Sequence, residues 1–146
     1  MKRTKRTRVV ECLATLTSSW VSVPFVSIRV APIFPVSDLR AALAFYQRLG
    51  FEVRPWRGGG YGFVTLDDVE IHLGVEPDLA ARTDRRATAY LFVEDADALA
   101  QTWLAAGADV RSPQDTEWGQ HEGALIDPDG NVIRFGSAIS TAKEKS

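Results

Sequence analysis

Residues 36–53 read VSDLRAALAFYQRLGFEV, and the same pattern returns 57 residues later as VEDADALAQTWLAAGADV at residues 93–110. Asp38 and Asp95 are suited to cap a helix at its N-terminus, and Gly50 and Gly107 are suited to end one. Between these positions apolar residues recur at helical spacing. The repeat therefore predicts two modules of the same design, each with one helix.

Alternating apolar runs around the two helices predict strands in both halves of the chain. The expected strands cover residues 28–34, 51–56, 61–66, 69–75, 88–93, 109–112, 118–127 and 132–137. A shift of about 62 residues aligns the later strands of the two halves, and it places Leu66-Asp67 on Ile126-Asp127. The predicted fold class is therefore α+β, with two tandem βαβββ modules at about 28–76 and 87–137.

The two ends of the chain differ from this domain, which we place at residues 24–139. Residues 1–23 form a basic extension, with five Lys or Arg between residues 2 and 8 followed by a mildly apolar stretch, and residues 140–146 form a short tail. The extension has the outline of a secretory signal but lacks a small-x-small cleavage site. The alternatives are an export signal and a disordered or loosely docked extension.

Charge and cysteine content narrow the classes of partner. Residues 24–139 carry 10 Arg, no Lys and 17 Asp plus Glu, and an acidic body of this kind repels nucleic acid. No stretch approaches the ~20 apolar residues of a membrane helix. The single cysteine, Cys12, lies in the extension, which excludes a disulfide framework and a cysteine-based zinc site. We therefore expect a cytoplasmic protein with no nucleic-acid or membrane partner.

The repeated βαβββ pattern resembles the glyoxalase/bleomycin-resistance/extradiol-dioxygenase superfamily, whose members have the vicinal oxygen chelate fold. The segments Val36-Ser37-Asp38-Leu39 and Leu49-Gly50-Phe51 are similar to that superfamily, and the ending DPDGNVIRFG at residues 127–136 is typical of it. Residues 118–125, WGQHEGAL, resemble a stretch of bleomycin-resistance proteins, although His121 and Gly123 stand where Arg and Phe are commoner.

The resemblance also implies an oligomeric state. Pro32 stands where bleomycin-resistance proteins carry an early proline that is associated with a strand exchanged between subunits. A strand-exchanged homodimer is therefore implied, with two clefts at the subunit interface that are each lined from both chains. Exposed sheet edges and concave faces would also favour a dimer.

Catalytic branches of the superfamily hold a divalent metal at four positions on the concave sheets, and the resemblance places these positions on Ala31, His72, Thr88 and Arg134. Alanine has no donor atom, threonine is a poor ligand, and arginine is a cation. One imidazole alone does not hold zinc, iron or manganese. We therefore expect no metal and no cofactor. His72 is either a polar group that lines the cavity or a satisfied, half-buried imidazole.

Aromatic residues at strand ends are the leading candidates for ligand contacts, because rigid rings stack well on a planar heteroaromatic group. The predicted ligand-binding residues are Trp56, Tyr61, Phe63, His72, Trp118, Gly119, His121 and Arg134. The run Gly58-Gly59-Gly60 is expected to be a flexible hairpin loop, which could also serve as a flap over the ligand. Nearby acids, such as Asp115, Glu117 and Glu122, would attract a cationic tail.

The sequence thus favours a metal-free binding protein, and not an enzyme, that sequesters a bulky, cationic, partly aromatic antibiotic of the bleomycin type. Neither histidine stands in a motif for nucleophilic catalysis, and no catalytic residue is predicted. Two alternatives remain open. One is a metal-dependent lyase, isomerase or transferase of the same superfamily, and the other is a module that binds a small metabolite.

Overall fold

The computed structural model describes residues 7–11, 20–24, 28–81, 84 and 86–139. The chain divides into two units, Met1–Val30 and Ala31–Ser146. In the first unit, β1 (Thr7–Glu11) pairs antiparallel with β2 (Trp20–Pro24). Each segment contains two valines, whose branched side chains favour strands, and the role of the extension stays a prediction. Cys12 lies outside the described residues.

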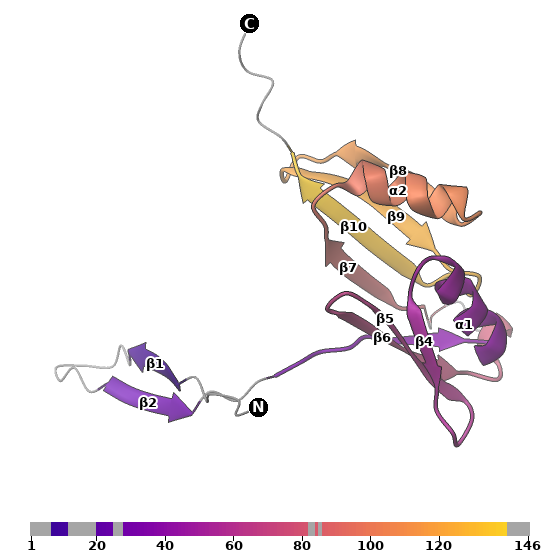
Figure 1. The fold of residues 1–146 in the computed structure, drawn as a ribbon, viewed down its shortest axis with the longest axis horizontal. Coiled ribbons are helices and arrows are strands. Elements are labelled where there is room, and N and C mark those ends of the chain that lie inside the picture. The colour runs from indigo at the N-terminus through magenta and orange to yellow at the C-terminus, as the bar shows by residue number, and fades with distance from the viewer. Residues whose placement is uncertain (1–6, 12–19, 25–27, 82–83, 85, 140–146) are drawn as a thin grey trace, which may run out of the picture. The chain divides into compact units, whose positions relative to one another are not determined.

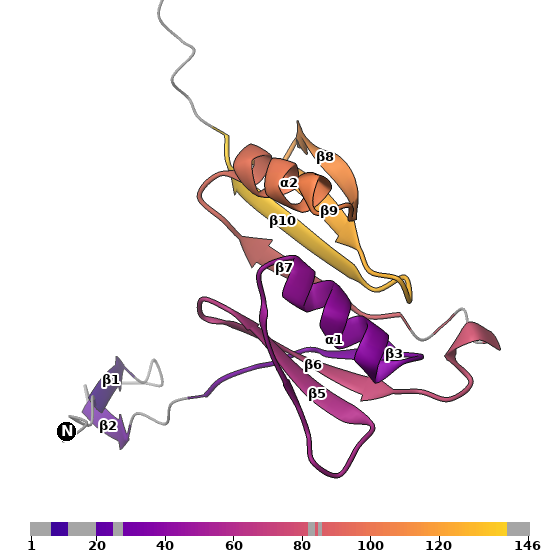
Figure 2. The same ribbon diagram turned by 45° about the vertical axis from the view of Figure 1, so that its right-hand side comes forward.

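The second unit consists of two modules, each with a four-stranded sheet and one helix (Figures 1 and 2). The first module contains β3 (Ile33–Val36), α1 (Leu39–Arg48), β4 (Glu52–Pro55), β5 (Tyr61–Leu66) and β6 (Val69–Val75). After a 3-10 turn at Leu79–Ala81, the second contains β7 (Thr88–Phe92), α2 (Ala96–Ala105), β8 (Asp109–Asp115), β9 (Gln120–Ile126) and β10 (Val132–Ala138). The predicted tandem βαβββ architecture is confirmed.

The two sheets have the same topology. Their strand orders are β3-β6-β5-β4 and β7-β10-β9-β8, and in each sheet the first strand pairs parallel with the last. The other neighbouring strands are antiparallel. This arrangement leaves β3 and β4 at the edges of one sheet and β7 and β8 at the edges of the other.

The helices begin and end where the sequence predicts. The Asp38 carboxylate accepts a hydrogen bond from the Ala41 amide at 3.0 Å, and Asp95 accepts one from Ala98 at 2.9 Å. Gly50 and Gly107 follow the two helices with φ of 100° and 81°, a conformation that glycine adopts at little cost. Among the described residues, no helix has the length and apolar character needed to cross a membrane.

The strand boundaries required correction at the first strand, which begins at Ile33 and not at Ile28. Pro32 has no amide hydrogen, and it contributes only its carbonyl, which accepts from the His72 amide at 2.9 Å. The regular ladder between β3 and β6 therefore starts at the residue after Pro32, where Ile33 pairs with His72.

The strands around Trp118 also differ from the prediction. β8 extends to Asp115, with an irregularity between Arg111 and Gln114, and β9 begins only at Gln120. The intervening residues form a tight turn, in which the Gly119 amide donates to the Thr116 carbonyl at 3.2 Å. Trp118 therefore lies in a turn and not in a strand.

One apolar core is shared by both modules. Trp103 of α2 is fully buried, and its indole nitrogen donates to the Leu49 carbonyl at the end of α1 at 3.2 Å. Its ring stacks with Phe51 at a centroid distance of 6.5 Å and meets Phe135 edge-on at 5.3 Å. Because this tryptophan of α2 contacts the segment between α1 and β4 in the first module and β10 in the second, the two modules share one core.

The DPDGN segment before β10 joins the modules by hydrogen bonds. The buried Asp127 carboxylate accepts from the Tyr46 hydroxyl at 3.0 Å and from the Asn131 side-chain amide at 2.8 Å. Asn131 also donates to the Pro35 carbonyl at 2.8 Å, and Asp129 accepts from the Ser37 hydroxyl at 2.7 Å. Burial and Asp127 raise the pKa of Tyr46 far above its ordinary value, so the phenol stays protonated and remains a donor.

Candidate functional site

Each sheet has one face that packs on its helix and one that does not, which we call the open face. On β6, Ile71 and Leu73 are fully buried, and the alternation of a strand places Glu70 and His72 on the opposite, open face. On β10, Ile133 and Phe135 are buried in the same way, and Arg134 lies on the open face. Four of the predicted ligand residues lie on these two faces, namely Tyr61, Phe63, His72 and Arg134.

Three of the predicted residues form one aromatic cluster on the open face of the first sheet. The ring centroids of Tyr61 and Phe63 on β5 lie 5.5 Å and 4.9 Å from that of His72 on β6. Gly74 lies beside the Tyr61 ring, since a Cβ atom there would be 3.6 Å from it. Tyr61 also lines a pocket of about 500 Å³, together with Ile33 and Glu76, which is within the size range of small-molecule sites.

Hydrogen bonds connect this cluster into a chain of three side chains. Glu70 Oε1 lies 2.7 Å from His72 Nε2, and the Tyr61 hydroxyl lies 2.9 Å from His72 Nδ1. A carboxylate only accepts, so Nε2 carries the hydrogen, and in the neutral imidazole Nδ1 accepts from the Tyr61 hydroxyl. Both ring nitrogens of His72 are therefore engaged, which makes it a satisfied imidazole on the open face.

Arg54 belongs to the same face, although no sequence motif singles it out. Its guanidinium lies 3.9 Å from the centroid of the Phe63 ring, which it pairs with across β4 and β5. The contact covers one face of that ring with a cation. A ligand ring that stacks on that face of Phe63 must therefore displace Arg54.

The second group lies on the open face of the other sheet. The Arg134 guanidinium on β10 forms an ion pair with Glu122 on β9, and the Glu122 side chain is only 5% exposed. The indole nitrogen of Trp118 donates to the other carboxylate oxygen of Glu122 at 3.3 Å. Trp118 itself is 65% exposed, so its large apolar ring faces solvent while its indole nitrogen is hydrogen-bonded to Glu122.

Further aromatic residues on this face were missed by the sequence analysis. Tyr90 lies over Gly136, where a Cβ atom would collide with the Tyr90 hydroxyl. Phe92, two residues further along β7, is 83% exposed. Residues 88–92 form a strand, and its period of two could have shown from the sequence that Tyr90 and Phe92 share one face.

Trp56 is joined to Tyr61 through its backbone, but its ring lies over the glycine loop. It stands at the hairpin between β4 and β5, and its ring covers Gly58, where any Cβ atom would collide with it. Its amide donates to the Tyr61 carbonyl at 2.8 Å, and its carbonyl accepts from Gly59 at 3.1 Å. The glycine loop is thus closed by backbone hydrogen bonds around Trp56, and its role as a flap stays a prediction.

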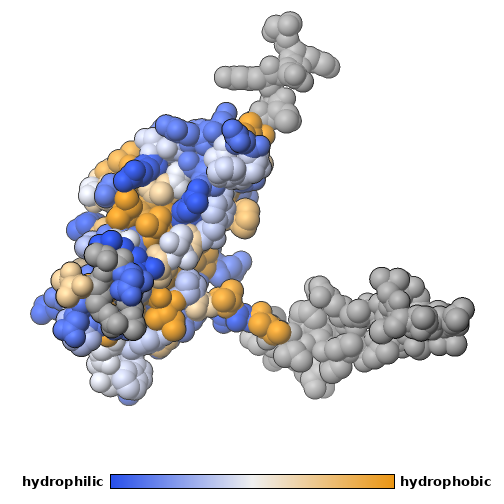
Figure 3. Space-filling model, turned by 180° about the vertical axis from the view of Figure 1, so that it is seen from behind, coloured by the Kyte–Doolittle hydropathy of each residue, from blue (hydrophilic) through white to orange (hydrophobic). Residues whose placement is uncertain are grey.

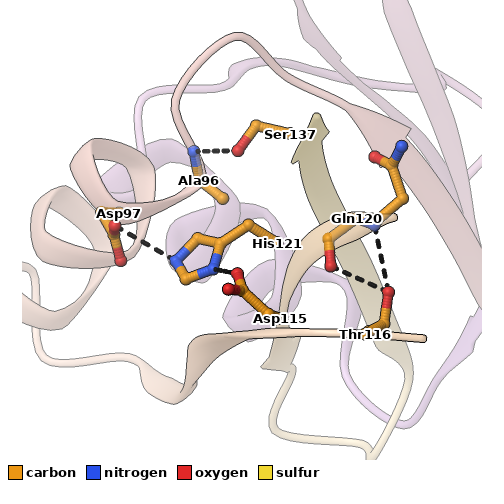
Figure 4. A network of polar contacts seen from close by, with 7 residues as sticks. All are labelled: Ala96, Asp97, Asp115, Thr116, Gln120, His121 and Ser137. Atoms are coloured by element: carbon orange, nitrogen blue, oxygen red, sulfur yellow. Dashed lines mark hydrogen bonds and ion pairs between the residues drawn. The ribbon is translucent and has the colours of Figure 1, made fainter. Parts of the chain in front are cut away.

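His121 also lies away from the other predicted residues, on the face of β9 opposite to Glu122. Its Nδ1 lies 2.7 Å from Asp115 and its Nε2 lies 3.1 Å from Asp97 in the first turn of α2 (Figure 4). Hydrogen bonds to Asp115, and then to Asp97, raise the pKa of His121 above its ordinary value. The structure therefore gives His121 carboxylate partners, and Asp115 is engaged as well.

Gly123 stands where the resembling proteins more often carry Phe, and the structure supplies a steric reason for this difference. A Cβ atom at this position would lie 2.8 Å from the Arg111 carbonyl and 2.8 Å from the Phe135 ring. The neighbouring backbone of β8 thus passes too close for any side chain, beside the irregular pairing in that strand.

The four positions that the resemblance assigns to a metal do not fit a divalent cation. Ala31 has no donor, Arg134 is a cation paired with Glu122, and both nitrogens of His72 are engaged. In the described part of the chain, no group of three or more His, Cys, Asp or Glu side chains is arranged to hold a metal ion. The carboxylates on His121 lie on opposite ring nitrogens and so cannot share one ion with it.

The fold and these residues define the class of protein. A sequence model of the Glyoxalase/Bleomycin resistance protein/Dioxygenase superfamily matches residues 29–135, and the chain belongs to this superfamily. A bleomycin resistance protein of Klebsiella pneumoniae is 28% identical over 116 residues, which cover 73% of this chain and 90% of that protein.

Solved structures agree with this assignment of the fold. A bleomycin resistance determinant encoded on the transposon Tn5 is 24% identical with a TM-score of 0.66, over 77% of this chain and 98% of its own. A bleomycin-binding protein complexed with bleomycin is also 24% identical with a TM-score of 0.66, over 77% of this chain and 100% of its own.

Proposed function

We propose that this protein binds a bulky, cationic, partly aromatic antibiotic of the bleomycin type and sequesters it without changing it chemically. The observation that carries the proposal is Trp118, whose ring is largely exposed while its indole nitrogen is hydrogen-bonded to Glu122. An exposed aromatic ring in a fixed orientation loses little freedom when a planar ligand stacks on it. The Klebsiella pneumoniae relative, a bleomycin resistance protein, supports the choice of ligand.

The distribution of charge supports a cationic ligand. The segment 24–139 carries 17 acidic residues against 10 arginines. Two of those arginines on the open faces are already engaged, Arg134 with Glu122 and Arg54 with the Phe63 ring. Hydrophobic residues form patches among polar ones on the surface of this unit (Figure 3). Apolar patches within an acidic surface suit a ligand that is both aromatic and positively charged.

Sequestration requires tight binding and no reaction. Three of the four positions that hold the metal in catalytic members of the superfamily carry Ala31, Thr88 and Arg134, which are poor ligands or none, and this supports a site that works without a metal. The single cysteine and the ordinary composition remain the reasons to expect a cytoplasmic protein. In the cytoplasm the protein would meet an antibiotic that has entered the cell. The ligand-binding domain is proposed to span residues 24–139, between the basic extension and the tail.

We further propose a homodimer with exchanged strands, as the resemblance implies. The predicted ligand residues belong to two different modules, with Tyr61 and His72 on the first sheet, Arg134 on the second, and Trp118 in the turn before β9. Exposed Phe92 and Ile33, at 83% and 57%, lie on the edge strands β7 and β3. A dimer would cover such residues and could bring the two groups together from different chains. Sedimentation equilibrium tests this directly, and a mass near that of one chain at micromolar concentration would contradict it.

The proposed ligand class can be tested by a thermal-shift screen with bleomycin, phleomycin and unrelated cationic or aromatic compounds. A ligand at one hundred times its dissociation constant adds about 2.7 kcal/mol to the free energy of unfolding. We expect the bleomycin-type compounds to raise the melting temperature far more than the simple cations do. Equal shifts with all cations would indicate a site without the proposed aromatic recognition.

An enzyme of the same superfamily is the second candidate, and the Glu70–His72–Tyr61 chain is the observation in its favour. A carboxylate that orients an imidazole beside a hydroxyl can move a proton during a reaction. Mass spectrometry of bleomycin recovered after long incubation separates the two functions. Recovery of the intact compound supports sequestration, and a covalent change that requires His72 supports the enzyme.

A further inference from the structure

The turn that carries Trp118 is closed by several hydrogen bonds between its two ends. The amide and the hydroxyl of Thr116 each donate to the Gln120 carbonyl at 2.8 Å. The Gln120 amide in turn donates to the Thr116 hydroxyl at 3.1 Å (Figure 4). Asp115 and His121 are the next pair of residues in the ladder, directly outside this turn. The side chains of that pair therefore lie at the base of the turn.

His121 connects this base to the helix. Its Nδ1 contacts Asp115 of β8 at 2.7 Å, and its Nε2 contacts Asp97 of α2 at 3.1 Å. The start of α2 is itself tied to β10, because the Ala96 amide donates to the Ser137 hydroxyl at 3.3 Å. We call Asp97, Asp115 and His121 the histidine clamp. It links the Trp118 turn to an element that is anchored in the core.

The clamp is complete in only one protonation state of His121. A carboxylate accepts but does not donate, and a neutral imidazole has a single N–H group. Both contacts are hydrogen bonds only when the ring is an imidazolium. Among the described residues, the titratable groups in contact with the ring are Asp97 from α2 and Asp115 from β8, while β10 presents the Ser137 hydroxyl. Both carboxylates raise the pKa of His121, in agreement with this geometry.

The other side of the same turn holds the ring that faces solvent. Trp118 donates to Glu122, which is the neighbour of His121 in β9 and points to the open face. His121 and Glu122 are consecutive residues joined by one planar peptide unit, so a displacement of this end of β9 moves their side chains together. The position of Trp118 relative to the core thus depends on contacts made on the opposite face of the sheet.

We propose that His121 is a positioning residue for ligand binding: its imidazolium holds the Trp118 turn against α2, so affinity for a planar aromatic ligand falls as pH rises. This inference rests on the proposed function. It assigns His121, which touches no other predicted ligand residue, a role that acts through Trp118. The commoner arginine at this position would carry a permanent charge, whereas histidine makes the contact dependent on pH.

The test uses the full chain and bleomycin as the probe, with calorimetric titrations between about pH 6 and about pH 8.5. The wild type should bind about two- to fivefold more weakly at the alkaline end, the size expected for loss of one surface ion pair. His121→Gln should lack this contribution and keep only the pH dependence that comes from the ligand itself, so the comparison of the two proteins isolates His121. Asp97→Asn, which retains His121, should reduce the difference, and Asp109→Asn, an exposed carboxylate at the other end of β8, should preserve it.

A second readout needs no ligand. The indole N–H resonance of Trp118, assigned with Trp118→Phe, should follow the titration of His121 in the wild type and stay constant in His121→Gln. An indole resonance or an affinity with the same pH dependence in both proteins would overturn the inference alone. If bleomycin does not bind at any pH while the indole still follows His121, the proposed function falls, and with it the role of the clamp in binding.

Discussion

The indole nitrogen of Trp118 donates to Glu122 at 3.3 Å, and the other oxygen of that carboxylate is paired with Arg134. The buried carboxylate thus joins the exposed ring to the open face of the second sheet. Glu122 balances the arginine charge and fixes the edge of the ring, so it orients the surface that we propose stacks on the ligand.

Trp118→Ala should weaken bleomycin binding by at least ~2 kcal/mol, about thirtyfold in affinity, because it removes an aromatic anchor. The melting temperature should change little, since the ring is mostly exposed. Calorimetric titration with melting curves measures both quantities. Leu104→Ala is the matched control, because it removes an exposed apolar side chain, at 47%, from α2, which carries no predicted ligand residue. An equal loss in both variants would contradict a specific role for Trp118.

Tyr61→Phe should keep the aromatic cluster and remove the hydroxyl that donates to His72. We expect bleomycin affinity to fall by about 1 kcal/mol if the Tyr61 oxygen accepts a hydrogen bond from the ligand. Double-mutant cycles with His72→Asn reveal whether the two side chains act together, since partners in one chain of hydrogen bonds give non-additive losses. Additive losses would indicate that His72 contacts the ligand independently of Tyr61.

Asn131→Ala should destabilise the whole second unit and not only the turn before β10. The side chain donates to Pro35 and Asp127 and accepts from Ala87, so its removal leaves buried polar groups of both modules unsatisfied. Each such group costs about 1–3 kcal/mol. Chemical denaturation should show a lower free energy of unfolding, still in a single transition for this unit. Separate transitions for the two modules would contradict the shared core.

The histidine clamp also predicts how stability depends on pH. Because the folded-state pKa of His121 is raised, the clamp stabilises the protein fully below the unfolded value, near 6.5, and the gain is lost as pH rises through the folded value. The gap in free energy of unfolding between the wild type and His121→Gln should therefore shrink from acid to alkaline pH. It should remain below about 1 kcal/mol throughout, since the carboxylates are exposed. A gap that grows with pH would show that His121 is favoured in its neutral form.

The architecture could be predicted because its signals are local. Asp38 with Gly50, and Asp95 with Gly107, mark the ends of the helices by cap chemistry that needs no distant partner. The strand that begins at Ile33 was predicted too long because the effect of Pro32 depends on its neighbour in the sheet. The modules were thus predictable, whereas the limits of individual strands depended on pairing.

The site was only partly predictable because its contacts depend on register and on strand phase. Trp118 was assigned to a strand, whereas β9 begins only at Gln120. His121 and Glu122 face opposite ways in any strand, but which of them faces α2 depends on the pairing of β9 with β10. The contact of Arg54 with Phe63 follows from the pairing of β4 with β5. Tyr61, Phe63 and His72 were each named as candidates from the sequence, but their contacts with one another and the link to Glu70 required the structure.

Calorimetric titration of the wild type with bleomycin, after treatment with a chelator, tests the central claim most directly. The account predicts saturable binding of one bleomycin per chain without added metal, and recovery of the compound with its mass unchanged. Absence of binding at ligand concentrations up to about 1 mM would contradict the account, since that limit leaves less than about 4 kcal/mol of binding free energy.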